Sequence, residues 1–145
     1  MYSRILVPTD GSEHVERVVA HALDIAERDG ATVHGLYVVD KGGMPELDAE
    51  MRDEVVKSFE RTGAGALDEF RELAEAGGAD VVTATAEGKP SKEIVEYVED
   101  NDVDLIVMGT HGRSGIRNVL MGSVAERVVR HSPVPVLLVN VEQGA

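Results

Sequence analysis

The stretch Arg4–Ser12, which reads RILVPTDGS, decides how the rest of the chain is interpreted. Residues Arg4–Pro8 form a short, largely apolar run without alternation, which is typical of a strand buried on both faces of a sheet. The residues directly after it favour a turn. Ser12–Arg28 then changes to a helical spacing of apolar residues, and Gly30 is placed to end that helix. The chain therefore opens with a buried strand, a turn and an amphipathic helix.

The same alternation of strand-like and helix-like segments continues along the chain. Further strands are predicted at Thr32–Val39, Asp80–Ala86, Val103–Met108 and Val134–Val141. Further helices are predicted at Glu46–Ala76, at Ser91–Asp102 with Ser91 as its cap, and at Ser123–His131. The alternation predicts the α/β fold class, with an open, five-stranded, mostly parallel sheet and helices on both faces. No linker or internal repeat interrupts it, so residues 1–145 are predicted to form one domain.

The predicted helix Glu46–Ala76 is unusually long and contains two glycines, Gly63 and Gly65. Each glycine costs about 1 kcal/mol relative to alanine in a helix interior. The apolar stripe nevertheless keeps its phase across them, which favours one helix, straight or bent, over two. The stripe consists of Met51, Val55, Phe59, Ala66, Phe70 and Leu73. Gly63 falls on the buried face, where a close neighbour would explain the missing side chain.

The chain is strongly acidic, because 14 Lys and Arg residues face 27 Asp and Glu residues, for a net charge of −13. Nucleic acids and anionic membrane surfaces require clustered cations, so both are disfavoured as partners. Such a surface indicates either a protein of a salt-rich cytoplasm or an ordinary acidic protein.

The composition also excludes several kinds of chemistry. Cysteine is absent, so the chain has no disulfide, thiolate nucleophile or Cys-ligated metal. The apolar run VPVLLV near the end is too short to cross a bilayer, and the opening MYSRILVPTDGS lacks the features of a signal peptide. A cytoplasmic location is therefore expected.

The segment GTHGRSGIRNVLMGS, from Gly109 to Ser123, carries the most informative spacing in the chain. Its glycines, which include Gly112 and Gly122, allow the backbone to approach an anion closely. The N–H groups of a helix that starts near Ser123 favour a phosphate, and Arg113 and Arg117 would add positive charge nearby. Ser123 would either cap that helix or donate its hydroxyl to a phosphate oxygen. The segment fits neither a P-loop, a G-x-G-x-x-G fingerprint, a kinase signature nor a G-x-S-x-G elbow.

Each candidate residue also has an ordinary structural interpretation. Asp10 or Ser12 could simply cap the first helix, Val38 could be a core residue of its strand, and the glycines could serve only as turn residues. His111 is better placed to lie near a ligand than to act as a base, because no triad-like nucleophile accompanies it. The remaining histidines and the acidic run Glu96–Asp104 lack metal-ligand spacing, so no protein metal site is predicted.

The spacing Gly-x2-Gly-x9-Gly-Ser between a strand ending in IVMG and a terminal SPVPVLLV resembles the nucleotide-binding branch of the universal stress protein family. The opening ILVPTDGS and the second-strand LYVVD are also similar to that family. The match covers essentially the whole chain in the expected order. It implies a sheet order of 3-2-1-4-5, with a nucleotide over the carboxyl ends of the first and fourth strands.

The resemblance further implies which residues contact the nucleotide. The expected ligand is ATP or another adenine nucleotide, with Mg²⁺ or Mn²⁺ on its phosphates. Asp10 would contact the adenosine end and Val38 the adenine. The full set carried over by motif is Pro8, Thr9, Asp10, Val38, Met108, Gly109, Thr110, His111, Gly112, Arg113, Ser114, Gly115, Gly122, Ser123 and Val124. The motif assigns no catalytic residue.

The family resemblance also implies a homodimer in which Val136–Val141 of two chains pair across a two-fold axis. An apolar strand at a sheet edge requires such a cover. The expected function is a stress-response sensor or signalling dimer with slow or no hydrolysis, read by an unknown protein partner. Two other classes stay open, namely an ATP-using enzyme that hydrolyses or adenylylates, and a nucleotide-free dimeric scaffold. Multiple turnover would indicate the enzyme, and a lack of nucleotide binding would indicate the scaffold.

Overall fold

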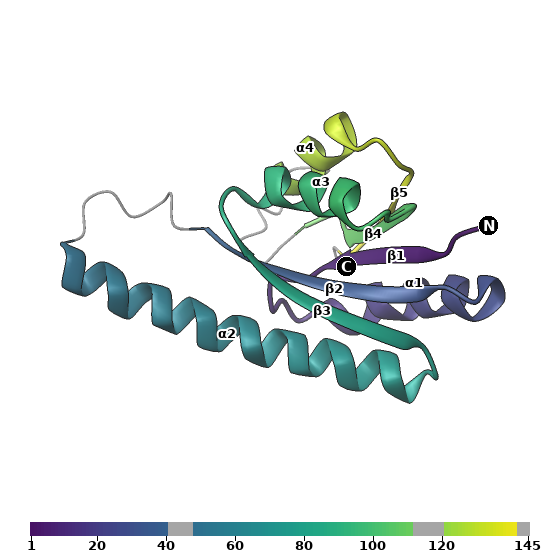
Figure 1. Ribbon diagram of the computed structural model, residues 1–145, viewed down its shortest axis with the longest axis horizontal. Helices are drawn as coiled ribbons and strands as arrows, with labels where there is room; N and C mark the ends of the chain where they lie inside the picture. The colour runs from purple at the N-terminus through teal and green to yellow at the C-terminus, as the bar shows by residue number, and fades with distance from the viewer. Residues whose placement is uncertain (41–47, 112–120, 142–145) are drawn as a thin grey trace.

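The computed structural model describes residues 1–40, 48–111 and 121–141 of the chain, and Figure 1 shows their arrangement. The strands are β1 (Arg4–Pro8), β2 (Thr32–Val39), β3 (Asp80–Glu87), β4 (Leu105–Gly109) and β5 (Val136–Val139). The helices are α1 (Val15–Asp29), α2 (Ala49–Ala76), α3 (Pro90–Asp100) and α4 (Ser123–His131).

The strands form one sheet in the order β3-β2-β1-β4-β5, and every neighbouring pair is parallel. The register aligns Ile5 of β1 with Val33 of β2 on one side and with Leu105 of β4 on the other. Strands β3 and β5 are the two edges. The predicted α/β fold class and the expected strand order are both confirmed.

The sheet is covered on both faces, as its apolar strands require. Figure 1 shows α1 and α2 on one face and α3 and α4 on the other. Side chains alternate along β1, so Ile5 and Val7 join the cluster under α1 and α2, whereas Leu6 joins the cluster under α3 and α4. Each of these side chains is almost fully buried. Strand β1 therefore contributes side chains to two separate hydrophobic clusters, one on each face of the sheet.

Helix α2 runs without a break through Gly63 and Gly65, so the prediction of one helix is confirmed. A β-carbon at Gly63 would overlap the ring of Tyr37 on β2. Gly35, also on β2, is held against Phe70 of α2 in the same way, since its β-carbon would lie 2.5 Å from the ring. Both glycines let an aromatic ring fill the space between the helix and the sheet.

The expectation that the whole apolar stripe of α2 packs inward is wrong for its first half. Met51 is 52% exposed and Phe59 is 38% exposed, and burial begins only at Gly63. Figure 1 shows the reason, because the first half of α2 extends beyond the end of the sheet. Across the described ranges, no helix combines the length and apolar composition that a membrane span requires.

Helix starts differ from the predictions by up to three residues. α1 begins at Val15 rather than at position 12, and α2 begins at Ala49, where the Asp48 carboxylate accepts the N–H of Met51 at 2.8 Å. The prediction that Ser91 caps α3 is wrong. The helix begins one residue earlier, at Pro90, whose fixed φ suits the first helical position.

Two strands are shorter than predicted. β4 starts at Leu105 rather than two residues earlier, because the Asp104 carboxylate accepts the N–H groups of Ser3 and Arg4 at 2.8 and 3.2 Å and closes the start of the sheet. β5 starts at Val136, directly after Pro135, which has no N–H to donate. The strand ends at Val139 rather than at position 141.

Candidate functional site

The candidate site lies where the chain leaves β1 and β4. These two strands are neighbours in the sheet, but β1 leads through α1 to one side and β4 leads toward α4 and β5 on the other. In open α/β sheets, ligands bind at the carboxyl ends of strands at such a switch point. The carboxyl ends here are Pro8 and Gly109.

The turn after β1 is fixed by the neighbouring strand. The N–H of Thr9 donates to the carbonyl oxygen of Leu36 on β2 at 2.8 Å, and Thr9 is buried. Gly11 adopts a φ of 78°, which favours glycine, and its N–H lies 3.4 Å from the Thr9 hydroxyl oxygen. Pro8 is half-buried beside this turn.

Asp10 holds the turn rather than the helix. Its Oδ1 accepts the N–H of Ser12 at 3.0 Å, which makes an Asx turn. The capping position of α1 belongs to His14, which makes no side-chain cap. The alternative that Asp10 or Ser12 caps α1 is therefore wrong, and half-buried Asp10 lies in the turn at the end of β1.

The residues after β4 are tied to the end of β5. The N–H of Thr110 donates to the carbonyl oxygen of Val139 at 3.0 Å, and the Thr110 hydroxyl oxygen accepts the N–H of Val141 at 3.4 Å. That hydroxyl also lies 3.1 Å from Nδ1 of His111. A β-carbon at Gly109 would lie 3.2 Å from Val141, so this glycine also serves packing.

Helix α4 starts beside Thr110, the residue that follows β4. The N–H of Gly122 donates to the carbonyl oxygen of Thr110 at 2.6 Å, and Gly122 occupies the capping position of α4. Ser123 is the first helical residue and is exposed, so the alternative in which it caps the helix is wrong. Gly122 has no side chain, so the capping residue itself accepts none of the N–H groups of the first turn. They form a partial positive charge at the switch point.

Apolar residues of the site belong to the cluster under α3 and α4. Met108 is buried in it, whereas Val38, Met121 and Val124 are half-buried at its margin. Val38 and Val124 thus combine a packing role with some exposed apolar surface. Each comes from a different element that ends or begins near the carboxyl edge of the sheet.

The structure therefore brings together Pro8, Thr9, Asp10, Gly109, Thr110, His111, Gly122, Ser123 and Val124 around the ends of β1 and β4. Four further predicted contacts, Gly112, Arg113, Ser114 and Gly115, lie outside the described residues. The described ranges contain no group of three or more His, Asp and Glu residues arranged to hold a metal ion.

Sequence reasoning missed the residues that fix the site through their backbones. Leu36 and Val139 each accept a hydrogen bond from the residue that follows the neighbouring strand. These contacts depend on strand register, and no side-chain pattern in the sequence indicates them.

A buried polar pair lies away from this site, between β2 and α3. Nδ1 of His34 lies 2.7 Å from the hydroxyl of Tyr97, and their rings meet edge to face. Burial lowers the pKa of His34 below its ordinary 6.5, and the nearby Arg4 charge lowers it further. Burial raises the pKa of Tyr97 above its usual value. The interpretation of His34 as a structural histidine is thereby supported.

Comparison with known proteins places the chain among relatives over nearly its whole length. Residues 1–140 match the model of the universal stress protein family. The universal stress protein MJ0531 of Methanocaldococcus jannaschii is 41% identical over 141 residues, which cover 97% of this chain and 83% of the relative.

Solved structures agree with the fold. The structure of MJ0577, a universal stress protein of Methanocaldococcus jannaschii, superposes with a TM-score of 0.86 at 32% identity and covers 97% of this chain and 96% of that one. A universal stress protein solved in complex with cAMP superposes with a TM-score of 0.69 at 30% identity, covering 96% and 97% of the two chains.

Proposed function

The chain belongs to the universal stress protein family, and from this premise we propose that it binds an adenine nucleotide, in the first place ATP, across the carboxyl ends of β1 and β4. One observation carries the proposal. The start of α4 is held by a 2.6 Å hydrogen bond from the N–H of Gly122 to the carbonyl oxygen of Thr110, and the capping residue Gly122 has no side chain to accept the N–H groups of the first turn. A phosphate placed there would accept the N–H groups and lie at the positive end of the helix dipole.

The described residues fit such a ligand. Phosphate oxygens would accept hydrogen bonds from the backbone and hydroxyl of Ser123, beside Gly109 and Gly122. The adenosine end would lie over the turn after β1, with Asp10 contacting it and Val38 offering apolar surface to the base. The structure of a 30% identical relative with cAMP supports an adenine ligand in this fold.

A divalent cation, Mg²⁺ or Mn²⁺, would bind with the phosphates and neutralise part of their charge. Phosphate oxygens and water would be the main ligands of such a cation. The cationic environment that a polyphosphate needs is otherwise scarce in a chain of net charge −13.

The function that follows is that of a nucleotide-dependent stress-response sensor or signalling protein. Nucleotide occupancy would alter the surroundings of Gly109–Gly122, and a protein partner would read that change. The chain would act as a homodimer paired through Val136–Val141. Hydrolysis would be slow or absent, since the motif assigns phosphate binders but no base or water-positioning residue.

The proposal is tested by purifying the protein without added nucleotide, denaturing it and separating the released compounds by ion exchange. About one adenine nucleotide per chain is expected where cellular ligand survives purification. An empty protein that also fails to bind added ATP with Mg²⁺ would refute the proposal. Multiple turnover that is lost on changing Asp10 or His111 would instead indicate an ATP-using enzyme.

A further inference from the structure

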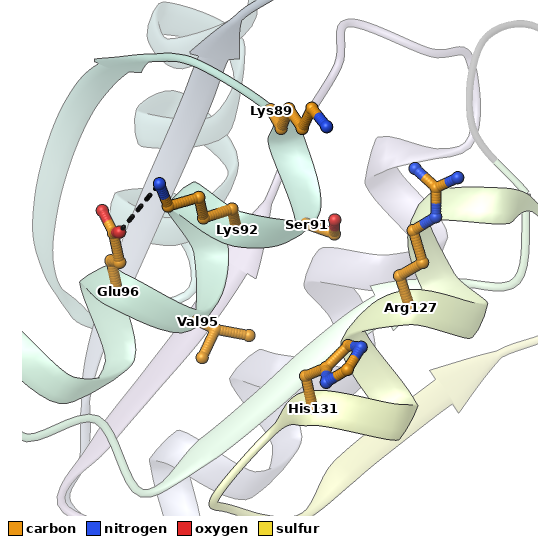
Figure 2. Close-up of a pocket in the computed structure, with 7 residues that line it drawn as sticks. All are labelled: Lys89, Ser91, Lys92, Val95, Glu96, Arg127 and His131. Carbon is orange, nitrogen blue, oxygen red and sulfur yellow. Dashed lines mark ion pairs between the residues drawn. The ribbon is translucent and has the colours of Figure 1, made fainter.

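A cavity of about 380 Å³ lies between α3 and α4, on the opposite side of these helices from the sheet core, and its lining is cationic. Figure 2 shows Lys89, Ser91 and Lys92 at the start of α3 and Arg127 and His131 on α4, at the margins of this groove. We call it the α3–α4 groove.

The charge of the α3–α4 groove is opposite to that of the protein as a whole. The net charge of the chain is −13, and its lysines are Lys41, Lys57, Lys89 and Lys92. The last two line the groove together with Arg127, whereas its lining contains a single carboxylate, that of Glu96. An anion near this surface therefore meets attraction where the rest of the molecule offers mostly repulsion.

Two of the groove cations, Lys89 and Arg127, form no ion pair with any of the described residues. Lys92 forms an ion pair with Glu96 at 3.8 Å, but no such pair is found for Lys89 or Arg127. By contrast, Arg130 on the next turn of α4 is paired with Glu126 at 2.9 Å. The groove thus keeps positive charge that its own helices do not neutralise.

The arrangement fits an extended ligand better than a single ion. In Figure 2 the side chain of Lys92 turns toward Glu96 and away from Lys89 and Arg127, so the three cations do not converge on one point. Val95 supplies apolar surface between the two sides of the groove. A chain that alternates carboxylates with apolar side chains would complement both features.

From these observations we propose that the α3–α4 groove is the docking site for an acidic, partly apolar segment of a partner protein. This inference rests on the proposed function, in which a partner protein recognises whether the nucleotide is bound. The groove is well placed for that role. Helix α4 begins at Ser123, beside the candidate phosphate position, and its later residues Arg127 and His131 line the groove.

The test is a fluorescence anisotropy titration of the protein with a labelled peptide that alternates Glu and Leu. A peptide with Gln in place of every Glu is the matched ligand control. The acidic peptide is expected to bind, to weaken as salt is raised, and to lose at least about tenfold in affinity when Lys89→Glu or Arg127→Glu is introduced. Lys57→Glu makes the same charge change on α2, away from the groove, and is expected to alter the affinity less than about twofold.

Several results would overturn the proposal. These are failure of the acidic peptide to bind the folded protein, equal binding of the Gln peptide, and equal weakening by all three substitutions. Binding of an oligothymidylate as tight as that of the peptide would indicate a general polyanion site instead. A change of oligomeric state caused by Arg127→Glu would indicate that a second copy of the chain occupies the groove. Lys89→Gln and Arg127→Gln, checked by circular dichroism, replace the charge reversals if either variant fails to fold.

The nucleotide proposal is kept separate by titrating ATP into the same variants. ATP affinity is expected to stay within about twofold of the original, because these side chains lie in the groove and not at the ends of β1 and β4. ATP binding without peptide binding would refute the docking site alone. Peptide binding without ATP binding would support the docking site and refute the proposed function.

Discussion

The N–H of Gly122 donates a 2.6 Å hydrogen bond to the carbonyl oxygen of Thr110. This bond joins the residue that follows β4 to the residue that precedes α4, across the intervening part of the glycine motif. The positive end of α4 is thereby placed at the switch point of the sheet. The proposed nucleotide site depends on this relationship more than on any single side chain.

The first prediction concerns Gly122 itself. Its φ of −68° and ψ of 161° suit any residue, so Gly122→Leu should keep the fold while its bulk blocks the approach of a phosphate. We expect ATP affinity to fall more than about tenfold, which is above about 1.4 kcal/mol. Isothermal titration calorimetry measures this, with Gly65→Leu as control because a β-carbon there meets nothing within 4 Å. Unchanged affinity in Gly122→Leu would count against the site.

The second prediction compares two glycines of α2 that lie on opposite sides of the helix. Gly65→Ala should stabilise the protein by about 0.5–1 kcal/mol, because alanine is the better helix former and the space is open. Gly63→Ala should destabilise it by about 1–3 kcal/mol, because the added methyl group overlaps the ring of Tyr37. Urea unfolding followed by circular dichroism measures both. Effects of the same sign would contradict the packing described for α2.

The third prediction concerns the pH dependence of stability through His34. Burial and Arg4 lower its pKa in the folded state, so the unfolded chain binds a proton more readily near the ordinary value of 6.5. The contribution of His34 to stability is therefore present above pH 6.5 and is lost as the pH falls below it. Compared with His34→Gln, the original protein should lose stability between pH 7.5 and about 5.

Thermal or urea unfolding across this pH range checks the difference between the two proteins. His21→Gln is the matched control, because His21 is exposed on α1. A stability difference between original and His34→Gln that does not change with pH would show that His34 titrates alike in both states.

The fourth prediction separates the two edges of the sheet. Leu137 on β5 is 37% exposed and Val82 on β3 is 41% exposed, so the two side chains are similarly accessible. If β5 pairs with its copy, Leu137→Asp should weaken the dimer at least about tenfold by placing carboxylates against an apolar partner, whereas Val82→Asp should not. Sedimentation equilibrium measures both. A monomeric original protein, or a dimer indifferent to Leu137→Asp, would exclude this interface.

The fold class could be predicted because the apolar patterns are strong. Continuous runs such as Arg4–Pro8 indicate strands buried on both faces, and the helices between them show their own period. The strand order follows only from the family resemblance, because no residue pattern in the chain indicates which strands are neighbours. The predicted starts of β4 and β5 are wrong because one residue sets each of them. Asp104 closes the start of the sheet before β4, and Pro135 has no N–H to donate before β5.

The predicted burial of the first half of α2 is wrong for a different reason. Periodicity shows that Met51 and Phe59 share a face with Phe70, but it cannot show how far the sheet extends beneath that face. Burial is a property of the neighbouring element, and here the sheet ends before the helix does.

The candidate site can be predicted only in part from the sequence. The glycine motif predicts a helix that starts near Ser123, and α4 begins there, beside the end of β4. The roles of Asp10 in a turn and of Gly122 rather than Ser123 at the capping position needed the backbone geometry. The hydrogen bonds that the carbonyl oxygens of Leu36 and Val139 accept depend on long-range strand register, and no local sequence pattern indicates them.

The most direct measurement of the central claim is calorimetric titration of the nucleotide-free protein with ATP and Mg²⁺, at low and at high salt. The account predicts about one ATP per chain with a dissociation constant of about 1–100 µM, and competition by other adenine nucleotides. Absence of binding by ATP, ADP, AMP and cAMP at about millimolar concentration, with the protein shown to be folded at both salt concentrations, would contradict it.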